Sequence, residues 1–130
     1  MQYNTPFDFK NKDYGVGISS DSIGFNSNQI HLKIECERKE AYPNSCEGVM
    51  VCTVLQDGDT KKTNSYCQFK MNEKPSEECC AFEKIFYSLN IRSDFKKNDR
   101  FTVFIWNQKL KPFYVSKLSY QIYNYNFSIQ

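Results

Sequence analysis

Hydrophobic and polar residues alternate along most of this chain with a period of two, which is the pattern of strands rather than helices. In residues 29–37, QIHLKIECE, every second residue from Ile30 to Cys36 is apolar, and the residues between them are polar or charged. Successive side chains of a strand point to opposite faces, so this segment predicts a strand with one buried face. We expect Ile34 in the core and Lys33 in solvent.

The next two segments with strand character form a predicted hairpin. Residues 48–56, GVMVCTVLQ, are apolar enough for a central strand, and residues 63–70, TNSYCQFK, suit a strand that returns antiparallel to it. The Asp-Gly step at 57–58 lies between them, and Asp-Gly tolerates the positive φ angles that tight hairpin turns require.

Residues 80–91, CAFEKIFYSLNI, fit either a strand or an amphipathic helix. We favour a strand, because Ile85, Tyr87, Leu89 and Ile91 alternate with residues that are polar apart from Phe86. Residues 93–100, SDFKKNDR, then predict a turn.

Two further segments complete the pattern. Residues 101–107, FTVFIWN, predict a strand, residues 108–112 a turn, and residues 113–126 a last strand or bent pair of strands. Seven or eight short strands without alternating helices indicate an all-β protein, an antiparallel β-sandwich. A length of 130 residues is typical of one domain, which we expect to span residues 1–130.

Composition narrows the partners that such a domain would bind. Charged residues make up 25% of the chain, their signs are interleaved, and the net charge is +2. No basic stripe results, so we expect no nucleic-acid partner. No apolar run reaches the ~20 residues of a membrane span, and residues 1–20 lack the apolar run of a signal peptide.

Six cysteines make the compartment an open question. An exported chain would bridge some of them, and we expect a disulfide among the cysteines that we assign to loops: Cys46, Cys67, Cys79 and Cys80. Cys36 and Cys52 lie in strand patterns and would stay free. The spacing contains no C-x2-4-C pair, so we expect no zinc site. Free thiols throughout, with Met1 as the native start, would instead indicate a cytoplasmic protein.

Residues 96–123 resemble the closing hairpin of jelly-roll domains from envelope and secreted proteins of Bacteroidetes. In those domains an Asn-Asp turn precedes a strand of the type "vYiWN", a Lys-rich turn and a final strand. Here the corresponding residues are Asn98-Asp99, the segment 103–107, the turn 109–111 and the segment 114–118. The resemblance implies a jelly-roll sandwich, often an extracellular or periplasmic accessory module that binds carbohydrate. Where those domains usually have two acidic residues in the last strand, this chain has Ser116-Lys117. The carboxylates that could bind calcium are therefore missing at these positions.

No segment carries a catalytic or cofactor signature. His31 is the only histidine and lies on the polar face of its strand, where a solvated imidazole is the ordinary state. A glycoside hydrolase would need two acids across a cleft, such as Asp57 with Asp59 or Glu77 with Glu78. These acids fall in predicted turns or loops, so we favour a non-catalytic protein without a cofactor.

Surplus aromatic residues provide the candidate binding site. In residues 101–107 both faces of the strand are apolar, so the face that carries Trp106 needs a loop, a partner protein or a ligand to cover it. Aromatic rings stack on sugars while amides bind their hydroxyl groups. We therefore predict a carbohydrate site formed by Trp106, Asn107, Tyr114 and Tyr123, with a secreted protein–protein interaction domain as the alternative.

Overall fold

The computed structural model describes residues 2–3, 7–8, 14–19, 22–43, 48–56, 62–71 and 80–124. Their regular elements are all strands, and the described part of the chain has no helix long and apolar enough to cross a membrane. The strands are β1 (Gln2–Tyr3), β2 (Phe7–Asp8), β3 (Tyr14–Ser19), β4 (Ser27–Glu40), β5 (Val49–Leu55), β6 (Thr63–Lys70), β7 (Glu83–Phe95), β8 (Arg100–Trp106) and β9 (Phe113–Asn124).

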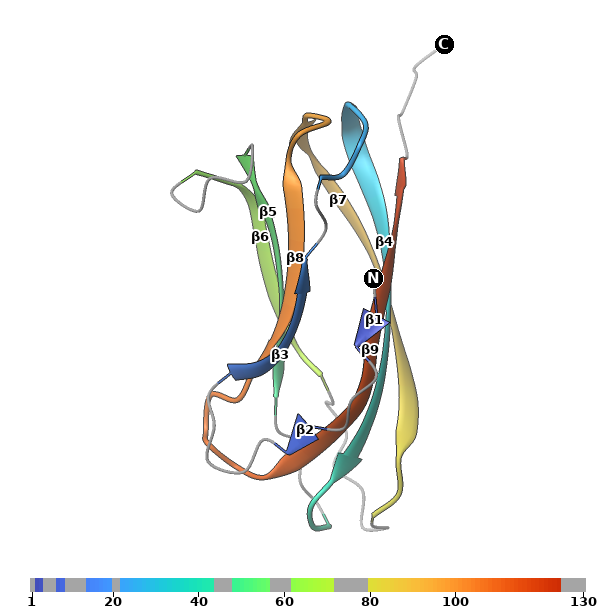
Figure 1. The fold of residues 1–130 in the computed structure, drawn as a ribbon, viewed down its shortest axis with the longest axis vertical. Helices are drawn as coiled ribbons and strands as arrows, with labels where there is room; N and C mark the ends of the chain where they lie inside the picture. Colours follow the sequence, from blue (N-terminus) through green and yellow to red (C-terminus); the bar gives the residue numbers. More distant parts are fainter. Residues whose placement is uncertain are drawn as a thin grey trace.

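The strands form two antiparallel sheets that face each other (Figure 1). One sheet has the order β1-β9-β4-β7, with β2 also paired to β9, and the other has the order β3-β8-β5-β6. From β3 to β9 every connection passes from one sheet to the other, except the one that joins β5 to β6. This is the strand order of a jelly roll, so the predicted antiparallel β-sandwich is confirmed.

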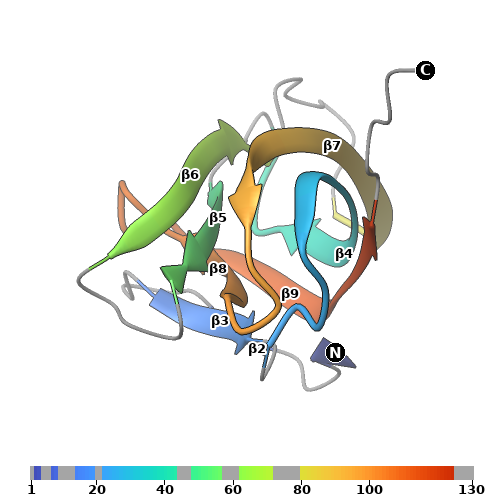
Figure 2. The same ribbon diagram turned by 90° about the horizontal axis from the view of Figure 1, so that it is seen from above.

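The core lies between the sheets, which enclose it when the molecule is seen from above (Figure 2). It is built from the apolar face of each alternating segment, as the period of two requires. The largest fully buried side chains include Phe95, Phe101, Phe113, Ile30, Leu32, Ile34, Met50, Ile105, Leu118 and Val51. Ile34 is 1% exposed and Lys33 is exposed, so the predicted faces of β4 are confirmed.

The structure resolves the choice between strand and helix for residues 80–91. Residues from Glu83 onward form β7, which pairs with β4 along its length. The predicted hairpin of residues 48–56 and 63–70 is also present as the β5–β6 pair, although its Asp-Gly turn lies outside the described residues.

The predicted turn at 93–100 is shorter than expected, because β7 continues to Phe95, whose ring is fully buried. The turn itself is held by Asp99, which is 3% exposed. Its carboxylate accepts hydrogen bonds from the Lys96 backbone N–H (3.0 Å) and from Asn64 Nδ2 (3.1 Å). Asp99 is therefore a structural residue that ties this turn to β6.

Candidate functional site

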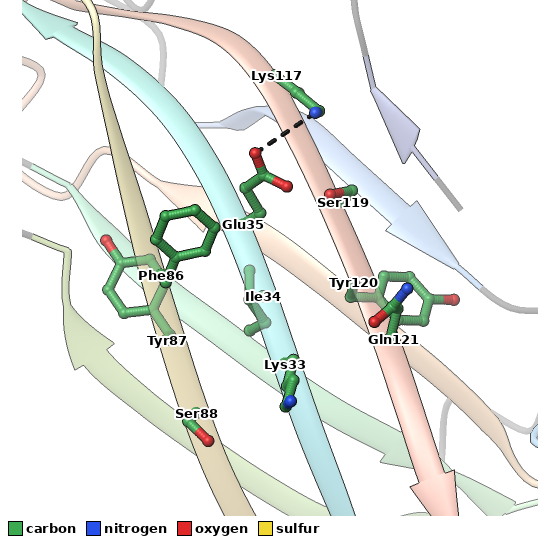
Figure 3. A pocket seen from close by; sticks show the side chains of 10 residues that line it. All are labelled: Lys33, Ile34, Glu35, Phe86, Tyr87, Ser88, Lys117, Ser119, Tyr120 and Gln121. Atoms are coloured by element: carbon green, nitrogen blue, oxygen red, sulfur yellow. Dashed lines mark hydrogen bonds and ion pairs between the residues drawn. The ribbon is translucent and has the colours of Figure 1, made fainter.

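A groove of about 690 Å³ lies on the outer face of the sheet formed by β9, β4 and β7 (Figure 3). We call it the groove throughout, and its lining residues are Lys33, Ile34, Glu35, Phe86, Tyr87, Ser88, Lys117, Ser119, Tyr120 and Gln121. Seven of them are at positions whose side chains point away from the core. The groove therefore lies on the solvent side of the sheet.

Strand register sets the positions of these side chains. On β4 the outward residue Lys33 stands opposite Ser88 of β7 and Gln121 of β9. One step along the sheet, Glu35 stands opposite Phe86 and Ser119. Residues that face each other across a sheet have Cβ atoms ~5 Å apart, so each row presents three side chains to the same ligand.

Aromatic rings are exposed over this face. Phe86 is 70% exposed and lies in the groove, beside Glu35 in Figure 3. Tyr123 (42% exposed) and Phe82 (43% exposed) lie beyond it, near opposite ends of β4, and a half-buried Tyr114 accompanies Phe82. Exposed aromatic side chains grouped on one face are typical of binding surfaces.

Charged groups on the face are held in defined places. Glu35 Oε1 lies 3.4 Å from Lys117 Nζ and 3.9 Å from Lys84 Nζ. Lys33 Nζ lies 5.5 Å from the ring centroid of Tyr123. Lys39 Nζ lies between two rings, 5.0 Å from the centroid of Phe82 and 4.8 Å from that of Tyr114.

His31 adjoins the groove and forms hydrogen bonds with two residues of β7. Its Nδ1 lies 2.6 Å from Asn90 Oδ1, and its Nε2 lies 3.1 Å from the hydroxyl of Ser88. Since an amide oxygen only accepts, Nδ1 carries the proton, and in the neutral imidazole Nε2 then accepts from Ser88.

This serine–imidazole–amide sequence has the order of an acyl-transfer triad, which also needs N–H donors aimed at an oxyanion. We assign the two hydrogen bonds to fixing the imidazole of His31 beside the groove.

The four residues predicted as one binding group are divided between different parts of the molecule. Tyr114 and Tyr123 do lie on the outer face of β9, nine residues apart and therefore ~30 Å apart along the strand. Trp106 is half-buried and lies in β8, in the other sheet, on its outer face. The prediction of a single aromatic site was wrong because β8 and β9 belong to different sheets.

Asn107 is a further correction. It is fully buried, and its Nδ2 donates to the Lys111 carbonyl (2.7 Å) while its Oδ1 accepts from the Lys111 N–H (3.2 Å). The amide thus closes the turn between β8 and β9, in which Leu110 has a φ of +55°. Both polar ends of the side chain are used inside the protein, so Asn107 has a structural role.

Sequence reasoning missed the residues at the centre of the groove. Phe86 shares the polar face of its segment with Phe82, and an aromatic residue at a polar position was the available signal. Its neighbours in the groove, such as Lys33, Gln121 and Ser119, were visible only as ordinary polar positions. Their grouping depends on the pairing of β4 with β7 and β9, which are far apart in sequence.

Cysteine positions change the predicted bridging pattern. Cys67, which we assigned to a loop, lies within β6, directly opposite Cys52 of β5, and both carry free thiols, as does Cys36. Cys80 is not one of the free thiols, and Cys46 and Cys79 lie outside the described residues. The bridging of these three stays a prediction, as does the compartment that depends on it.

The facing thiols of Cys52 and Cys67 predict an unusual reactivity for Cys67. The Cys52 S–H donates to Cys67, which lowers the pKa of Cys67 to about 7 and raises the pKa of the buried Cys52. The thiolate is the nucleophile, so we expect iodoacetamide to alkylate Cys67 first, with a rate that is half-maximal near pH 7. Peptide mass spectrometry after timed alkylation measures this.

The matched variants for that prediction remove one buried thiol each. Cys52→Ala removes the donor and should move the midpoint of the Cys67 rate upward, toward the ordinary thiol range of ~8.5. Cys36→Ala removes a buried cysteine of the other sheet that does not contribute to the pKa shift of Cys67, so it should leave the midpoint unchanged. A midpoint insensitive to Cys52→Ala would show that the hydrogen bond does not set the pKa.

Metal ligands are dispersed over the part of the chain that the structure describes. No three His, Cys, Asp or Glu side chains among those residues are grouped so that they could hold an ion. The groove itself offers hydrogen-bonding groups, an ion pair and an exposed aromatic ring.

Comparison with known proteins finds resemblances among solved structures alone. No protein-family model matches the chain, and no curated protein matches its sequence significantly. A solved structure that resembles it is the C-terminal CBM6 of LamC, a marine laminarinase from Zobellia galactanivorans, with 8% sequence identity and a TM-score of 0.33. The match covers 90% of this chain and 99% of that one. At this TM-score the likeness does not bear on what the chain binds.

Proposed function

We propose that this chain is a non-catalytic carbohydrate-binding module, and that the groove on the β9-β4-β7 sheet holds the glycan. The observation that carries the proposal is Phe86, a phenylalanine with 70% of its surface exposed among the polar residues of the groove. This exposure does not stabilise the fold, because burying the ring away from water would lower the free energy of the folded state.

The chemistry around Phe86 matches a sugar. One face of a pyranose ring presents C–H groups that stack on an aromatic ring, and its hydroxyl groups need donors and acceptors on either side. Ser88, Ser119 and Gln121 supply both, and Glu35 with Lys117 adds a charged acceptor and a charged donor. A protein partner would favour a more apolar centre with fewer charged groups.

The proposal also places the protein where polysaccharides occur, outside the cell or in the periplasm. In that setting it would hold an attached enzyme or envelope complex near its polymer. A secreted protein–protein interaction domain is the alternative, and the experiment below separates the two.

We expect Phe86→Ala to weaken binding to the polysaccharide that the protein recognises by about tenfold or more, because stacking of the sugar on the ring is lost. The measurement is isothermal titration calorimetry, preceded by a screen on immobilised polysaccharides. Tyr66→Ala is the matched control, because Tyr66 is 57% exposed but lies on β6 in the other sheet. Thermal unfolding of each variant checks that the fold is kept.

Three results would contradict the proposal. One is that no polysaccharide binds the wild-type protein, and another is that Tyr66→Ala weakens binding as much as Phe86→Ala. A third is loss of binding on Trp106→Ala alone, which would place the ligand on the opposite sheet. Capture of a purified protein partner that depends on Phe86, without glycan binding, would support the interaction-domain alternative instead.

A further inference from the structure

Two lysines of β4 distinguish this face from a surface for neutral sugars. Lys33 lines the groove and Lys39 lies beyond its other end, and both point outward from the same strand. They are six residues apart, which corresponds to ~20 Å along a strand. Within the described residues neither lysine forms an ion pair, whereas Lys84 and Lys117 both lie near Glu35.

Aromatic rings hold both ammonium groups in place. Lys33 lies over Tyr123, and Lys39 lies between Phe82 and Tyr114. A cation–π contact at an exposed site is weaker than a well-placed charge-assisted hydrogen bond to an anion. Each ring therefore holds its lysine only weakly. An anionic ligand that binds to the face can replace this cation–π contact with a hydrogen bond to the ammonium group.

Charge on the face favours an anion as well. Two acids point outward next to the groove: Glu35 pairs with Lys117, and Glu37 keeps its charge while it accepts a hydrogen bond from the hydroxyl of Ser116 at 2.7 Å. The outward lysines of the same region outnumber these two acids: Lys33, Lys39, Lys84 and Lys117. A ligand with negative groups spaced along its length would meet one lysine near each end and Phe86 between them.

We propose, building on the carbohydrate-binding function above, that the groove recognises an acidic oligosaccharide whose carboxylate or sulfate groups are bound by Lys33 and Lys39. Phe86 stacks on a sugar ring between these two contacts, and the polar residues of the groove bind its hydroxyl groups. A span of ~20 Å requires several sugar units, so the ligand is a segment of a polymer and not a monosaccharide.

The test compares polymers that differ only in charge. Polygalacturonate is titrated against its fully methyl-esterified form, and a sulfated galactan against the same galactan after desulfation. We expect the charged member of one pair to bind at least about tenfold more tightly, and its affinity to fall as salt is raised from 50 to ~500 mM. The pair that responds shows whether carboxylate or sulfate is recognised.

Variants connect the charge preference to the two lysines. Lys33→Met combined with Lys39→Met should lower affinity for the charged polymer about tenfold more than affinity for its neutral counterpart. Lys70→Met is the matched control, because Lys70 is exposed on β6 of the other sheet. Phe86→Ala should weaken binding of both polymers.

The outcomes separate the two proposals. Equal binding of charged and neutral polymers, or no effect of the double lysine variant, overturns the acidic-ligand inference while carbohydrate binding stands. Absence of binding to any polysaccharide, neutral or charged, overturns both. Loss of charged-polymer binding on Lys70→Met as strong as in the double variant would show a general cationic effect and also overturn the inference.

Discussion

Replacing Ile34 with Asp should abolish the cooperative unfolding transition of this protein. Ile34 is 1% exposed in β4, which lies between β7 and β9, and its backbone neighbours across the sheet are Tyr87 and Tyr120. Losing the burial of an isoleucine costs about 2–3 kcal/mol, and an unpaired carboxylate in the core costs several more. The total approaches the whole stability of a typical domain, about 5–15 kcal/mol.

Lys33→Asp is the control one residue away. Its side chain points to solvent, so the free energy of unfolding should change by less than about 1 kcal/mol. Both variants are measured by urea denaturation followed through the fluorescence of Trp106, the single tryptophan, and through circular dichroism. Similar effects at the two positions would mean that the two faces of β4 have been assigned the wrong way round.

The faces of the strands were predictable from sequence because alternation is a local property. A shift of one residue along a strand moves a side chain from the core to solvent. The sequence of a segment such as 29–37 therefore shows which of its faces is buried. The same alternation favoured a strand over a helix for β7, where Ile85 and Tyr87 alternate with exposed residues. The ends of the strands were predicted less accurately. The end of β7, for example, depends on the packing of Phe95 in the core.

The composition of the site was not predictable to the same degree. Which strands become neighbours is decided by contacts between segments far apart in sequence, and Trp106 and Tyr114 were separated by that choice. Asn107 had the composition of a ligand-binding amide, and only the hydrogen bonds to Lys111 identify it as part of a turn. Phe86, by contrast, could have been placed on the outer face by the alternation of its segment alone.

Arg38 shows a charged residue where the alternation of β4 requires an inward side chain. It is 2% exposed, and its guanidinium carbon lies 4.5 Å from the ring centroid of Phe113. Its Nη2 donates to Glu40 Oε1 at 2.6 Å, and its Nη1 lies 3.6 Å from Met71 Sδ. Gly48, with a φ of +103°, leaves room there: a Cβ would lie 3.2 Å from Arg38 Nη1.

We expect Arg38→Met to lower the free energy of unfolding by about 3 kcal/mol, because it leaves the Glu40 carboxylate, 19% exposed, without its guanidinium partner. The thioether side chain keeps much of the packing against Phe113, so the loss reports mainly on the charge. Urea denaturation measures it, and Lys39→Met, one residue along on the outer face, should stay within about 1 kcal/mol of the wild type.

The double variant Arg38→Met with Glu40→Met decides what the ion pair contributes. Removing both charges eliminates the carboxylate that has lost its guanidinium, so the double variant should recover a large part of the stability lost in Arg38→Met alone. That recovery would show that the ion pair adds little net stability to the fold. The loss in Arg38→Met would then come from leaving the Glu40 carboxylate without its guanidinium. Additive losses in the two single variants and the double variant would contradict this, and would mean that Arg38 stabilises the sandwich through its packing on Phe113 and Met71.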